Sequence, residues 1–322
     1  MTYAKNQLIQ ATDYNNLIGT SPGSTANTLN TVWAVGSSGA GYGQGALANV
    51  AVDATIGNVA WANLIDRIAN VATHQGTSIT TISPPQADAT IAYLTPLVTN
   101  LQSIYTRRFS AATQGTTTSN TVTNTTSTWV DKLVITHTVS FANGDAARYF
   151  FNSGGQLAIT CSHSNTATAI NTLFNQLATN IGTVVISAMN TGNAQIAGTV
   201  YNGVTKVGGG GVGPSIQQNA GYYGQTTANS TIFSQTVSGS FYSSSFISVV
   251  TRTNGTQGTN LDAGSTYYVA TVWDEVYAPG SGVGLTVGTG STTTLTVRYP
   301  ESTNIANTWG NVTVSGVVTS AS

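Results

Sequence analysis

Residues 129–141 read WVDKLVITHTVSF, and this stretch decides the fold class. One face of it carries Leu133, Ile135, His137, Val139 and Phe141, and the other carries Val134, Thr136, Thr138 and Ser140. This period of two residues is typical of a β-strand with one buried face. The same alternation predicts further strands over residues 157–163, 184–188, 196–207, 232–237, 246–253, 266–276, 285–299 and 312–319.

Turn residues and one helical pattern complete the prediction for residues 129–322. Asn254-Gly255 is a strong signal for a tight hairpin. Apolar residues spaced three and four apart predict a single internal helix that ends at Gly182; they are Ile170, Leu173, Phe174, Leu177 and Ile181. We therefore expect an antiparallel β-sandwich or jelly-roll-like domain with one internal helix.

The capping and helix-ending residues within 1–112 predict a helical module. A short helix over 13–18 is expected, capped by Thr12 and ended by Gly19. A second helix begins at Asp53 or Thr55 in this reading and ends at Gly76. A third follows from Thr95-Pro96 to Arg107-Arg108, where the helix dipole favours cations.

A tract rich in Thr, Ser and Asn separates these two parts. It contains almost no large apolar residue, which fits either a linker or an edge segment of a sheet. We place the domain boundary there, with residues 113–128 as the linker.

Charge is scarce along the whole chain. Only 6% of its 322 residues are Asp, Glu, Lys or Arg, against roughly a quarter in an ordinary soluble domain. The 27 aromatic residues argue against disorder, so the composition predicts a folded protein whose neutral surface tolerates permanent neighbours. A net charge of −1 argues against nucleic acid as a partner.

Targeting and redox signals are equally sparse. No apolar run long enough to span a bilayer and no signal-peptide pattern is found, so no membrane partner is expected. The single Cys161 cannot form an intrachain disulfide. Synthesis in a reducing cytoplasm followed by assembly fits these features.

The sequence offers no catalytic, cofactor-binding or metal-binding residues. His137 and His163 fall in register with apolar strand positions, which favours a structural role, and His74 is expected to cap a helix end. Asp274 and Glu275 are adjacent on a strand and so cannot alone form a glycosidase pair. The run GGGGVG over 208–213 lacks the helix and the acid that a dinucleotide site needs, and reads as a loop.

Several strings resemble virion structural proteins of tailed bacteriophages, notably marine and cyanobacterial phages. The most specific is FANGDAARYFFNSGGQL over 141–157. Others are ATDYNNLIG (11–19), WAVGSSGAGYGQ (33–44), FISVVTRTNGTQGTNLDAGSTYYVATVWDE (246–275) and TVRYPESTNIANTWG (296–310). The resemblance implies a particle component and brings no catalytic residues with it.

Within the first of these strings we predict a turn and assembly motif. Gly154, and also Asn152, permits the positive φ of a tight turn. Asp145 caps a turn or pairs with Arg148 in this hypothesis. Core and interface area comes from three aromatic residues, which are Tyr149, Phe150 and Phe151. The motif would be a hairpin that organises the β domain or a subunit contact.

The sequence therefore predicts a non-enzymatic virion component, made in the host cytoplasm, of tail, neck or fibre type and forming a homo-oligomer. Its partners would be copies of itself and other virion proteins. A receptor- or glycan-binding module of a tail fibre, which would bind host surface glycan, remains an alternative. A head-decoration protein and a depolymerising enzyme are further alternatives.

Overall fold

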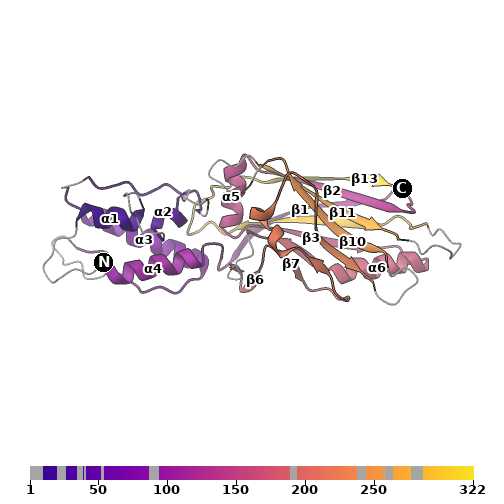
Figure 1. Cartoon of the computed structure of the whole chain (residues 1–322), viewed down its shortest axis with the longest axis horizontal. Coiled ribbons are helices and arrows are strands. Elements are labelled where there is room, and N and C mark those ends of the chain that lie inside the picture. Colours follow the sequence, from indigo (N-terminus) through magenta and orange to yellow (C-terminus); the bar gives the residue numbers. More distant parts are fainter. Residues whose placement is uncertain are drawn as a thin grey trace.

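The computed structural model describes residues 10–19, 27–34, 39, 41–51, 54–86, 94–188, 194–237, 244–255, 257, 264–276 and 286–322. Within these residues the chain is mainly β, with antiparallel sheets and an N-terminal helical region. Figure 1 shows the helices α1–α4 gathered at one end of an elongated molecule and the long strands running toward the other end. One continuous hydrophobic core extends through both parts, from Tyr14 to Val312.

Four helices form the N-terminal part: α1 (Ala11–Ile18), α2 (Leu29–Val32), α3 (Asn58–Gln75) and α4 (Leu94–Thr106). Helix α1 begins two residues earlier than expected, because Gln10 and Asp13 form a reciprocal capping box and Thr12 lies inside the helix. Its end at Gly19 is confirmed, with φ 90°. Helix α3 ends at Gly76 as predicted.

The start of α3 differs from the prediction. Gly57 is its N-cap, so Thr55 does not begin it, and Asp53 lies outside the described residues. The third predicted helix is confirmed as α4, with Arg107 and Arg108 just beyond its last residue.

Two antiparallel sheets form the larger part. The five-stranded sheet has the order β1-β12-β3-β4-β7, and the six-stranded sheet has the order β13-β2-β11-β10-β9-β8. The first comprises β1 (Gln114–Thr123), β12 (Ser291–Pro300), β3 (Gln156–His163), β4 (Thr183–Ile186) and β7 (Val204–Val207). The second comprises β13 (Thr313–Ala321), β2 (Lys132–Ser140), β11 (Thr266–Asp274), β10 (Phe246–Thr253), β9 (Ser230–Thr236) and β8 (Ser215–Ile216).

The two sheets pack face to face as a sandwich. Thr271 of β11 and Thr293 of β12 share a hydrogen bond between their hydroxyls at 2.7 Å. The ring of His163 on β3 lies 6.4 Å from that of Trp273 on β11. The alternation in residues 129–141 is confirmed, since Leu133, Ile135 and Val139 are fully buried.

The described residues of the β region contain two α-helices where one was expected. Helix α6 (Ala169–Ile181) is the predicted one, and it packs against β3 of one sheet and against β9 and β10 of the other. Its Phe174 contacts Trp129 at 4.8 Å between ring centres. Helix α5 (Gly144–Asn152) was missed, because its sequence was read as the approach to a hairpin.

The prediction of a linker over residues 113–128 is wrong for most of its length. Gln114–Thr123 form β1, the edge strand that pairs with β12. Polar side chains are tolerated there because most of the strand is exposed; the partly covered residues are Gln114, Gly115, Asn120 and Val122. The edge-segment alternative therefore describes this tract.

Two other predictions need correction. The strand expected over 196–207 is divided among β5 (Ala194–Ile196), β6 (Thr199–Tyr201) and β7, with Ala197 at φ 48° in the turn between the first two. Asn254-Gly255 does not form a two-residue hairpin, since β10 ends at Thr253 and β11 begins at Thr266. Instead, Asn254 Oδ1 accepts hydrogen bonds from the backbone N–H groups of Ser265 and Thr266.

Candidate functional site

Helix α5 carries most of the residues that the sequence singled out. Asn143 Oδ1 accepts a hydrogen bond from the backbone N–H of Ala146 at 2.8 Å and caps the helix. Arg148 is fully buried, and its Nη2 lies 2.8 Å from Asp145 Oδ1. Its guanidinium carbon lies 4.8 Å from the centre of the Tyr149 ring. Asp145 therefore pairs with Arg148 and places a negative charge in the first turn of the helix.

The two phenylalanines of α5 belong to the core. Phe150 and Phe151 are both fully buried. Phe151 stacks on Tyr222 with ring centres 4.9 Å apart, and it meets Phe150 edge-on at 5.1 Å. Tyr267 of β11 lies 5.6 Å from Phe151, and Phe141 lies 5.2 Å from Phe150. The expectation that these two side chains supply interface area is wrong, because no part of either reaches the surface.

The turn after α5 connects a helix to a strand. Gly154 has φ 91°, as its predicted role requires, and a Cβ there would lie 2.7 Å from the Cβ of Ala111. Asn152 is the last residue of α5, so the predicted hairpin is wrong. The segment leads from α5 into β3 and carries contacts to the helical part.

Asn152 links α5 to Gly39 and Gly41, which follow α2 in the N-terminal part. Its side chain is fully buried, and Nδ2 donates to the carbonyl oxygens of Gly39 at 2.6 Å and Gly41 at 2.9 Å. Its Oδ1 accepts a hydrogen bond from the Tyr223 hydroxyl at 2.6 Å. All three partners are far away in the sequence, so no local pattern points to this role.

Two further polar contacts join the helical and β parts. His74, in the last turn of α3, lies with its Nε2 3.0 Å from the carbonyl oxygen of Ser153, to which it donates. His74 thus bonds the β part and not its own helix end, which corrects the predicted capping role. Gln44 exchanges two hydrogen bonds with the backbone of Ala306, at 2.8 and 3.0 Å. We call these contacts, together with those of Asn152, the junction.

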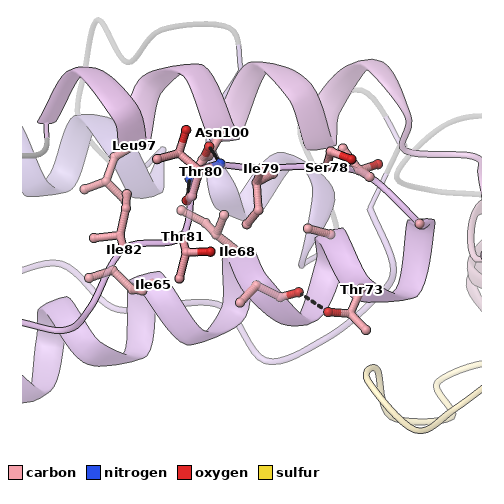
Figure 2. A pocket seen from close by; sticks show the side chains of 14 residues that line it. Ile65, Ile68, Thr73, Ser78, Ile79, Thr80, Thr81, Ile82, Leu97 and Asn100 are labelled. Atoms are coloured by element: carbon pink, nitrogen blue, oxygen red, sulfur yellow. Dashed lines mark hydrogen bonds between the residues drawn. The ribbon is translucent and has the colours of Figure 1, made fainter.

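A pocket of about 440 Å³ opens in the helical part. Figure 2 shows the extended segment 77–82 lying between α3 and α4, with Ile79 and Ile82 directed at the helices. The Asn100 side chain holds this segment through both the N–H and the carbonyl of Thr80, at 2.9 and 2.8 Å. The pocket is lined by aliphatic, hydroxyl and amide groups, so it suits an apolar guest and provides no acid or base.

The remaining histidines are structural. His163 Nε2 lies 3.0 Å from Asn171 Oδ1 on α6, and its Nδ1 lies 3.0 Å from the Ser291 hydroxyl on β12. His137 of β2 is fully buried, beside Gly316 of the neighbouring strand β13 and close to Asn120 of β1 in the other sheet. Burial lowers the pKa of His74 and of His137 to about 4, and it also lowers that of His163. These predicted structural roles agree with the geometry.

Two other ionisable groups have perturbed pKa values. Burial raises the pKa of the Cys161 thiol to about 12. Burial, aided by the nearby Asp131 and Asp274, raises the pKa of Glu275. Asp274 itself pairs with Lys132 at 3.1 Å. A thiol with this pKa is a poor nucleophile, and neither Asp274 nor Glu275 lines the pocket of the helical part.

In the described part of the chain, no group of three or more His, Cys, Asp or Glu residues is arranged to hold a metal ion. No helix of that part is both long and apolar enough to cross a membrane. Comparison with protein-family models, with curated proteins and with solved structures finds no match to this chain.

Replacing Asn152 with alanine is expected to lower the free energy of unfolding by about 1–3 kcal/mol, because it leaves the buried carbonyl of Gly41 without its side-chain donor, while the carbonyl of Gly39 keeps the Tyr223 hydroxyl. Urea denaturation of the full chain measures the change. The control is Asn70→Ala at an exposed position of α3, which should change stability by less than about 0.5 kcal/mol. Equal stability of Asn152→Ala and the control would contradict the role of the junction.

Proposed function

We propose that this chain is a non-enzymatic structural component of a tailed-phage virion, of tail, neck or fibre type, and that it works as a homo-oligomer. The resemblance of its sequence strings to phage virion proteins suggests the particle. The physical support comes from the surfaces of the two sheets.

The observation that carries the proposal is the outer face of the five-stranded sheet. Neighbouring hydroxyls on β1 and β12 pair in a regular ladder: Ser119 with Thr296 at 2.8 Å, Thr121 with Thr294 at 2.9 Å, and Thr123 with Thr292 at 2.9 Å. Thr160 and Ser162 of β3 continue these rows next to β12. An isolated soluble protein commonly places charged side chains at such positions, because charge keeps molecules apart.

The outer face of the six-stranded sheet is also nearly neutral. One cross-strand row contains Thr136, Ala270 and Val250, and the next contains Val134, Val272 and Ser248. Charge is confined to Lys132 and Asp274, which pair at one end, and to Arg252, which lies over the Tyr268 ring at 3.8 Å. The first face carries one charge near the end of β12, Arg298, which donates a hydrogen bond to Gln156. Nearly neutral faces on both sides of one sandwich favour a protein that is surrounded by copies of itself or by other subunits.

The elongated arrangement supports a division of labour. The helices lie at one end and the sandwich forms the body (Figure 1). In the proposed particle the helical end attaches to neighbouring subunits, and the sandwich builds the outer body. The hydrogen bonds of the junction, made by Asn152, His74 and Gln44, connect the helical part to the sandwich, so that a force on one part is passed to the other.

Sedimentation equilibrium of the purified full chain tests the homo-oligomer. The expected mass is two or more times 33.1 kDa, and we expect it to persist in high salt because the contacts between subunits are neutral. A mass of 33.1 kDa at every concentration and salt would contradict the proposed self-assembly.

A further inference from the structure

Both sheets end in a long strand on the same side of the sandwich. β13 pairs with β2 and β1 pairs with β12, and within the described ranges neither has a strand on its other side. The two edges lie one above the other: a Cβ on Gly316 of β13 would lie 2.6 Å from Val122 Cγ2 and 2.7 Å from Asn120 Oδ1 of β1. This side of the molecule therefore presents two stacked edges.

These edges lack the features that usually prevent strand pairing. An edge strand exposes backbone donors and acceptors, and natural proteins protect it with Lys, Pro, short length or bulges. β1 reads QGTTTSNTVT and β13 reads TVSGVVTSA, without one charged residue or proline. Their register shifts lie near one end, between Gln114 and Thr117 and between Val318 and Ser320. Most of each strand is thus regular.

The opposite ends of the two sheets are built differently. β7 has four residues and includes Lys206, and β8 has only two residues. Short length and a lysine are common protective features of edges. Because one side of the sandwich has this protection and the other does not, the unprotected side is suited to pairing.

The side chains of β13 also favour a partner. Val317 is 60% exposed, and Ser315 beside it on the same face is exposed as well. An exposed valine at the centre of an uncharged edge loses contact with water when a second strand covers it. A second uncharged edge strand can pair with β13 without electrostatic repulsion between the two.

We propose that two copies of this chain pair through their β13 edges, antiparallel and across a twofold axis, so that each six-stranded sheet continues into the other copy. The same axis brings the two β1 edges toward each other in the second layer. A copy is the occupant favoured here because an uncharged, regular edge is complementary to itself. This inference rests on the proposed homo-oligomer and names the surface that forms it.

Charge substitutions on β13 test the pairing. Across a twofold axis, antiparallel strands bring the same short stretch of each copy together, so like charges there oppose each other. The double variants Ser315→Lys/Val317→Lys and Ser315→Glu/Val317→Glu should each weaken self-association on the order of tenfold or more, as measured by sedimentation velocity of the full chain. An equimolar mixture of the two should regain association close to that of the unmodified chain.

The control is Val207→Lys, which adds a charge of the same sign to an exposed valine of β7, 39% accessible, at the protected opposite edge, and should leave association through β13 unchanged. Thermal unfolding of each variant verifies that the fold is retained. If the Lys and Glu variants assemble as the unmodified chain does, or if their mixture gains nothing, the β13 pairing is wrong while the homo-oligomer stands. If the unmodified chain is itself monomeric, both the homo-oligomer and this pairing are wrong.

Discussion

Replacing Phe151 with alanine is expected to lower the free energy of unfolding by about 3–5 kcal/mol, the largest effect of any single substitution considered for this chain. Phe151 is fully buried and lies at the centre of an aromatic cluster, against Tyr222, Tyr267, Phe150 and Phe141. The substitution removes the ring and leaves a cavity that neighbouring aromatic rings, held from three other elements, cannot fill.

Urea denaturation of full-length Phe151→Ala measures this loss. Phe246→Ala is the matched control, because it makes the same chemical change on the partly exposed outer face of β10 and should cost clearly less. Phe151→Leu should recover part of the loss by refilling the space. Similar losses at Phe151 and Phe246 would show that the cluster around α5 does not organise the core.

Acidification is expected to destabilise the chain through His74 and His137. Both have a folded-state pKa of about 4, below the ordinary 6.5, because burial disfavours the charged ring. The unfolded chain takes up protons below pH 6.5 while the folded chain does not, so stability is present above this pH and is lost as the pH falls toward 4. Each histidine contributes about 1.4 kcal/mol per pH unit, or about 3 kcal/mol across the window.

Denaturant unfolding at several pH values between 6.5 and 5 isolates this effect, because most carboxyl groups titrate at lower pH. His74→Gln should reduce the slope of unfolding free energy against pH by the contribution of one histidine. Glutamine is chosen because it can still donate a hydrogen bond to the carbonyl of Ser153. A stability that is constant between pH 6.5 and 5 in the unmodified chain would contradict the neutral, buried state of these rings.

Much of the fold follows from patterns of two and of three to four residues. The alternation in 129–141 identifies a central strand because each inward side chain packs against the opposite sheet. The outward positions are only partly buried, so they accept polar residues such as Thr136 and Thr138. The stripe of α6 is read correctly for the same reason, since Phe174 and its neighbours all face the core.

Where one local signal competes with another, the sequence misleads. Asn152-Ser153-Gly154-Gly155 favours a turn strongly, and this hid the helix before it, although Asn143 and Asp145 are good start signals. The sequence of β1 favours a linker because its strand character comes from pairing with β12, 169 or more residues away, and not from its own apolar content.

The junction and the pocket could not be predicted at all. Asn152, Gly39 and Tyr223 meet only after the chain has folded, and each residue alone is an unremarkable polar or small residue in a loop or helix end. The pocket depends on Asn100 holding the extended segment at Thr80, which again joins distant parts of the chain. Contacts of this kind leave no periodic trace in a sequence.

The central claim is that this chain is a structural part of a phage particle. Particles purified from a lysate in which the chain is produced can be labelled with gold-tagged antibody against it and imaged by electron microscopy, with copies per particle counted by mass spectrometry. The account predicts label at the tail, neck or fibres and a fixed copy number. A chain that is present in the lysate but absent from purified particles would contradict it, and label spread over the head would indicate a decoration protein instead.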